Sequence, residues 1–103
     1  MANWSVRDYQ PDSGKLVLAA PRFEFDDFES IAEQLLSILS AQVVEKQSHA
    51  DLHIWLIDFE GCRLLLKAEY YSEAVWLETL SAHEGQEELQ FITQFITQIT
   101  SNH

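Results

Sequence analysis

Residues 52–81, LHIWLIDFEGCRLLLKAEYYSEAVWLETLS, decide the fold of this chain. Apolar residues are dense in this stretch, and two short polar breaks, Glu60-Gly61 and Ser72-Glu73, divide it. A glycine-containing pair between two apolar runs is typical of a β-hairpin turn. We therefore predict an antiparallel meander of three strands, over residues 53–59, 62–71 and 74–80.

The two turns also predict how the strands pair. With Glu60-Gly61 as a two-residue loop, Asp58 lies opposite Arg63, and Trp55, Ile57 and Phe59 lie opposite Leu66, Leu64 and Cys62. With Ser72-Glu73 as the second loop, Lys67 lies opposite Glu78, and Ala68 and Tyr70 lie opposite Leu77 and Val75. Opposite charges then meet across neighbouring strands, which stabilises a sheet. The apolar face made by the other pairs is the one that we expect the helices to cover.

The flanking sequence predicts two amphipathic helices and an N-terminal hairpin. Asp26 caps the first helix in a capping-box pattern with Glu29, and this helix ends near Gln42. The pattern Ser81-Ala82-His83-Glu84 begins the second helix. Pro11-Asp12-Ser13-Gly14 is a turn signal, which makes residues 1–14 an N-terminal strand or arm. The apolar stripes of the two helices are Phe28, Ile31, Ala32, Leu35, Leu36 and Leu39, and Leu89, Ile92, Phe95, Ile96 and Ile99.

The element order is thus (β)β-α-β-β-β-α, which predicts an α+β fold. We expect a two-layer sandwich in which a mainly antiparallel sheet carries both helices on one face. Residues 1–103 then form a single domain. Residues 15–20 form the strand that precedes the first helix. The place of this strand in the sheet stays open, and a parallel position reached by a right-handed crossover is one solution.

The composition excludes several partners. The chain has 103 residues, with 6 Lys and Arg against 17 Asp and Glu, so its net charge is −11. Nucleic acids and anionic membranes both need a cationic surface, so we expect neither as a partner. No apolar stretch is long enough to span a bilayer, the first residues do not resemble an export signal, and Cys62 is a lone cysteine. These features predict a cytoplasmic protein without an intrachain disulfide.

Few residues point to chemistry. His49, Asp51 and His53 would project to one face if residues 49–53 form an extended strand, and two imidazoles with a carboxylate suit zinc or iron. Cys62 falls on the predicted core face, which favours a buried structural thiol over a nucleophile. The sequence shows no phosphate loop and no nucleophile elbow, so we expect a non-enzymatic protein without a cofactor.

The face of the meander opposite the helices is unusually apolar. Between the predicted charge pairs it presents Ile54, Leu56, Leu65, Trp76 and Leu80, with Leu56, Leu65 and Leu80 in one row. An exposed apolar row beside a tryptophan resembles a recognition surface. Three readings stay open: a protein partner covers the face, a second copy covers it in a homodimer, or the N-terminal segment with Trp4 and Tyr9 folds over it.

The run Asp51-Leu52-His53-Ile54-Trp55-Leu56 and the strand over residues 70–77 with Trp76 resemble a small family of uncharacterised bacterial proteins, a domain of unknown function. The resemblance covers the whole chain and implies a bacterial cytoplasmic setting, but no activity or catalytic residue. The function that we expect is a protein–protein interaction domain that uses the apolar face. The alternatives are a metal-binding protein or enzyme built on His49, Asp51 and His53, and an acidic inhibitor or immunity-like protein for a basic partner.

Overall fold

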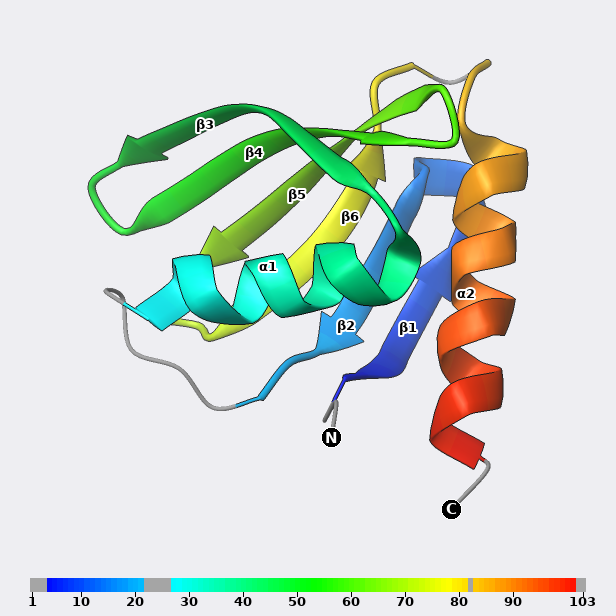
Figure 1. Ribbon diagram of the computed structural model, residues 1–103, viewed down its shortest axis with the longest axis horizontal. Helices are drawn as coiled ribbons and strands as arrows, with labels where there is room; N and C mark the ends of the chain where they lie inside the picture. The colour runs from blue at the N-terminus through cyan, green and yellow to red at the C-terminus, as the bar shows by residue number, and fades with distance from the viewer. Residues whose placement is uncertain (1–3, 22–26, 82, 102–103) are drawn as a thin grey trace.

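A six-stranded sheet and two helices make up the computed structural model, which describes residues 4–21, 27–81 and 83–101 (Figure 1). The strands follow the order β1-β2-β6-β5-β4-β3 across the sheet. All five pairings between them are antiparallel, so the fold is α+β as expected, and the parallel placement of the early strand is wrong. The strands and α-helices are β1 (Ser5–Gln10), β2 (Lys15–Ala19), α1 (Phe28–Leu39), β3 (Gln42–His49), β4 (Leu52–Phe59), β5 (Cys62–Glu69), β6 (Ala74–Thr79) and α2 (Gln86–Ser101), and a short 3-10 helix (Pro11–Ser13) joins β1 to β2.

Both helices cover the same face of the sheet. From α1, the ring of Phe28 stacks on His53 at 4.7 Å between centroids and meets the edge of Trp55 at 5.5 Å. From α2, Phe91 lies 6.0 Å from Phe59. His53, Trp55 and Phe59 are alternate residues of β4, so their side chains share one face. In Figure 1, α1 crosses in front of the sheet and α2 runs alongside β1.

The core lies between this face and the helices. All six residues of the predicted α1 stripe are buried, as are Leu89, Ile92 and Ile96 of α2. The α1 helix ends at Leu39 instead of near Gln42 because Ser40 adopts a left-handed conformation, with φ of 56°, and the chain then enters β3. Asp27 precedes the helix without a side-chain capping bond, and the predicted cap, Asp26, is outside the described residues.

The β4–β5 hairpin confirms the register predicted for it. Glu60 and Gly61 both have positive φ, at 51° and 85°, which is the geometry of a two-residue hairpin turn. The strands then pair Phe59 with Cys62 and Asp58 with Arg63, and the pairing continues to Leu52.

The β5–β6 hairpin corrects the register. Its loop has four residues, 70–73, because Glu73 donates its backbone N–H to the carbonyl of Tyr70 at 3.1 Å and closes a wider turn. Glu69 therefore pairs with Ala74, and every predicted pair is displaced by two positions. A shift of two residues keeps each side chain on its predicted face, whereas a shift of one would have reversed the faces.

Two further elements differ from the prediction. Residues 42–49 form β3, which the sequence prediction omitted, and its side chains are exposed along the whole strand. The second helix begins at Gln86 and not at the expected capping box. Ser81 and Glu84 instead form an isolated β-bridge, and Gly85 follows with φ of 92°.

Candidate functional site

The sheet surface opposite the helices, which we call the outer face, carries all five residues predicted for a binding surface. Helix-facing and outward-facing side chains alternate along β4, β5 and β6, so Ile54 and Leu56 of β4 point away from the helices. Leu65 and Trp76 do the same on β5 and β6. These four side chains are half-buried, while Leu80, just after β6, is 52% exposed.

Four of the five residues surround a shallow depression of about 270 Å³. Ile54, Leu56, Leu65 and Leu80 form its apolar floor and wall, and Glu45 and Gln47 of β3 form its polar rim. The rim is held by a hydrogen bond of 2.6 Å from the Gln47 amide to the Glu45 carboxylate. The outer face therefore combines a concave apolar centre with a polar border.

The corrected β5–β6 register changes which side chains are neighbours on the outer face. Leu65 lies opposite Glu78 and not opposite Leu80, so the predicted row of three leucines is wrong as a strand pairing. Leu80 still reaches the depression from the end of β6. Trp76 lies opposite Lys67 on β5 and Val17 on β2, which separates it from the depression.

A charge pair divides the depression from the tryptophan. Lys67 and Glu78, predicted to lie directly opposite, are diagonal neighbours, with Nζ and Oε2 3.3 Å apart. Their side chains are only 22% and 24% exposed. The Trp76 indole donates to the other oxygen of Glu78 at 3.0 Å. The predicted ion pair is thus present, and its carboxylate also fixes the orientation of the tryptophan ring.

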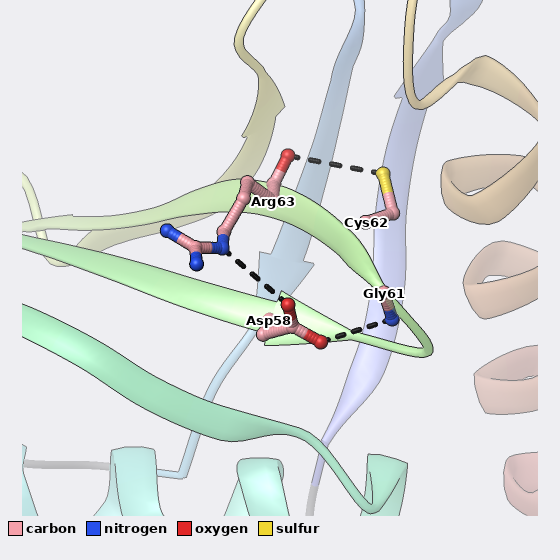
Figure 2. A network of polar contacts seen from close by, with 4 residues as sticks. All are labelled: Asp58, Gly61, Cys62 and Arg63. Carbon is pink, nitrogen blue, oxygen red and sulfur yellow. Dashed lines mark hydrogen bonds and ion pairs between the residues drawn. The ribbon is translucent and has the colours of Figure 1, made fainter.

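The second predicted charge pair closes the β4–β5 hairpin, as Figure 2 shows. Asp58 accepts a hydrogen bond of 2.9 Å from the backbone N–H of Gly61 through one oxygen. Its other oxygen lies 3.4 Å from Nε of Arg63. Because Asp58 binds both the turn and the next strand, this pair fixes the hairpin at the border of the outer face.

From Trp4 onward, the first described residue, the N-terminal segment does not cover the outer face. Trp4 is 2% exposed and belongs to the core. Tyr9 pairs with Leu16, a core residue, and packs against the same cluster. The segment forms an edge strand beside β2, so the intramolecular cover considered from the sequence is wrong.

The structure also separates the three residues considered for a metal. Ala50 and Asp51 form the turn between β3 and β4, so residues 49–53 are not one strand. His53 lies opposite Ser48, so these two side chains share the helix-facing side of the sheet. His49 is the next residue after Ser48 on β3, and its side chain therefore points to the opposite face. Within the described part of the chain, no group of three or more His, Cys, Asp and Glu is placed to hold a metal ion.

Cys62 lies on the helix-facing side, as predicted, but is only half-buried. It borders an open hollow of about 630 Å³ between the β4–β5 turn and the start of α2. Burial raises the pKa of the Cys62 thiol, and the carboxylate of Glu88, by charge and by hydrogen bonding, raises it further. The thiol is therefore protonated at neutral pH, which is the opposite of what a nucleophilic cysteine needs.

Fold and surface together define a small two-layer α+β domain with one sheet face left open by its helices. The chain belongs to the family described as "Protein of unknown function (DUF3630)", whose match spans residues 4–97. No curated protein and no solved structure matches the chain. Over the described residues, no helix has both the length and the apolar content needed to cross a membrane.

Proposed function

We propose that this protein is a non-enzymatic protein–protein interaction domain whose outer face binds its partner. The observation that carries the proposal is the apolar depression formed by Ile54, Leu56, Leu65 and Leu80 on a sheet face that neither helix covers. Covering the exposed part of an aliphatic side chain contributes up to about 1 kcal/mol, most for Leu80, which is 52% exposed, so the four residues together can anchor a partner.

The polar groups of the outer face support the same role. Trp76 presents a half-buried ring whose indole N–H is already bonded to Glu78, so a partner can pack on it without leaving a donor unpaired. The ion pairs Lys67–Glu78 and Asp58–Arg63 are preformed around the apolar centre. A preorganised polar border favours orientation and specificity.

The test compares outer-face variants with a matched control. Leu65→Glu and Trp76→Glu place a charge on the outer face, while Tyr71→Glu places the same charge on a loop aromatic that is 83% exposed. Immobilised wild-type and variant proteins are compared for the proteins that they retain, and each retained partner is then purified and its affinity measured. We expect both outer-face variants to bind at least about tenfold more weakly, with Tyr71→Glu unchanged.

Two results would contradict the proposal. Equal affinity of all variants would show that the outer face does not bind the partner. Light scattering could instead show a dimer of the wild type that Leu65→Glu dissociates, which would assign the outer face to self-association. Circular dichroism spectra of the variants provide the control for folding.

A further inference from the structure

We infer that the partner contributes an extended basic segment that pairs with β3 as a seventh strand and places an apolar side chain toward the depression. The inference rests on the function proposed above and specifies the chemistry of the partner. It is carried by three features of the described residues: an open strand edge, its position beside the depression, and the surrounding charge.

The open edge is β3. It is the last strand on its side of the sheet, and all eight of its residues are exposed. The last strand on the other side, β1, has α2 packed against it (Figure 1). From Glu45 to His49, β3 pairs with β4 without interruption, and the single irregularity lies between Val43 and Glu45. An edge strand of this kind offers unpaired N–H and C=O groups to another chain.

Edge strands are often protected by a lysine that blocks further pairing, and β3 does contain Lys46. Its ammonium group, however, lies 3.2 Å from Glu29 and 3.7 Å from Glu33, both on α1. It also lies 4.5 Å from the centre of the Trp55 ring. These contacts hold the Lys46 side chain on the helix-facing side of the sheet. Its charge therefore does not prevent another strand from pairing with the open edge of β3.

The depression lies within reach of such a strand. Glu45 and Gln47 of β3 form its rim, and Ile54 and Leu56 of β4 lie directly behind them. A strand added beyond β3 would be about 4.8 Å from it and about 10 Å from β4. A long or aromatic side chain on the outer side of that strand therefore spans the rim and contacts the depression.

The charges favour a basic segment over a second copy of this chain. On the outer face, Arg63 and Lys67 are already paired with Asp58 and Glu78. The carboxylate of Glu45 is bound by the neutral amide of Gln47. That contact leaves the negative charge of Glu45 uncompensated. A positively charged partner residue beside Glu45 would therefore form a favourable ion pair with it. A second copy would bring a further net charge of −11 and be repelled.

The probe for the test is the peptide acetyl-KVKVWVKVK-amide, which in an extended conformation carries lysines and a central tryptophan on one side. Its controls are the same peptide with Glu in place of Lys, and the basic peptide with N-methyl groups along one backbone edge. Binding to the full chain is followed by amide chemical shifts and by hydrogen exchange. We expect the basic peptide to protect amides of β3 and to shift those of Ile54 and Leu56. The acidic peptide should have no effect, and N-methylation should weaken binding at least about tenfold.

Protein variants separate the two parts of the proposal. Glu45→Gln should weaken binding of the basic peptide, whereas Glu87→Gln on the exposed side of α2 should not. The outer-face variant used with this peptide is Leu65→Asn, which removes the apolar side chain from the depression without adding a charge that would attract lysines. If Leu65→Asn weakens binding but N-methylation does not, strand pairing is refuted and the outer face keeps its function. If N-methylation weakens binding but Leu65→Asn does not, the edge pairs with strands and the outer-face function is refuted. No binding of the basic peptide, or equal binding of the acidic one, would overturn the inference.

Discussion

Gly14→Ala tests the attachment of the N-terminal hairpin to the strand that carries Trp76 and Glu78. Gly14 is buried just before β2, and its φ of 64° lies in the left-handed region. Its carbonyl accepts the backbone N–H of Thr79 at 2.9 Å. A Cβ atom at position 14 would overlap the hydroxyl oxygen of Thr79, whose side chain is itself buried.

The magnitude follows from two contributions. A left-handed conformation costs an alanine about 1–2 kcal/mol, and the reduced freedom of the unfolded chain offsets about 0.4–1 kcal/mol of this, which leaves about 1 kcal/mol. The overlap with Thr79 adds about 1–3 kcal/mol, the usual effect of overpacking a buried site. Gly61 provides the matched control, because its φ is 85° but nothing lies within 4 Å of an added Cβ. Gly61→Ala should therefore lower the free energy of unfolding only by the conformational contribution of about 1 kcal/mol, without the overlap.

Urea unfolding followed by tryptophan fluorescence measures both variants, since Trp4 and Trp55 are buried and report on the core. We expect Gly14→Ala to lower the free energy of unfolding by about 1–3 kcal/mol more than Gly61→Ala does. Adding Thr79→Ala to Gly14→Ala should recover part of that difference, because it removes the oxygen that the new Cβ meets. Equal losses for the two alanine variants would refute the reasoning.

Two further perturbations concern the helix-facing side. Phe28→Ala should lower the free energy of unfolding by about 3–5 kcal/mol, because the fully buried ring contacts His53 and Trp55 of β4. A thermal melt measures the loss. A loss below about 1 kcal/mol would contradict this packing. The Cys62 thiol should react slowly with a disulfide reagent at neutral pH and faster only well into the alkaline range, because burial and Glu88 raise its pKa. Glu88→Gln should shift that profile to lower pH and Glu87→Gln should not, whereas identical profiles would exclude the proposed influence of Glu88.

The β4–β5 hairpin could be predicted fully because its turn chemistry is specific. A two-residue turn with positive φ at both positions favours glycine, and Gly61 supplies it. The position of that turn then determines every pair along both strands, down to the ion pair of Asp58 with Arg63. Because side chains alternate between the two faces along each of these strands, the register also determines which side chains pack against the helices.

The β5–β6 hairpin lacks such a signal. Ser72-Glu73 contains neither glycine nor asparagine, so a two-residue turn with two positive φ values is unfavourable there. The wider loop needs a positive φ only at Glu73, where it is 55°. Since hydrophobic alternation repeats every two residues, the sequence pattern distinguishes an odd displacement but not an even one. The faces were therefore predicted correctly, while the neighbours of Leu65 and Trp76 were not.

The strand β3 was missed for a different reason, and that reason bears on the proposed interaction. A strand is recognised in a sequence by the side chains that it buries, and β3 buries none of its eight. The sequence here contains two local signals, the β-branched pair Val43-Val44 and the pair Ala50-Asp51. The first follows the predicted helix end near Gln42, and the second lies inside the extended strand expected over residues 49–53. The same exposure leaves its outer edge open to another strand. Strand pairing gains its energy from backbone N–H and C=O groups, which are the same for every residue type except proline. The open edge of β3 can therefore be recognised only from the order of strands in the sheet, and not from the residue pattern.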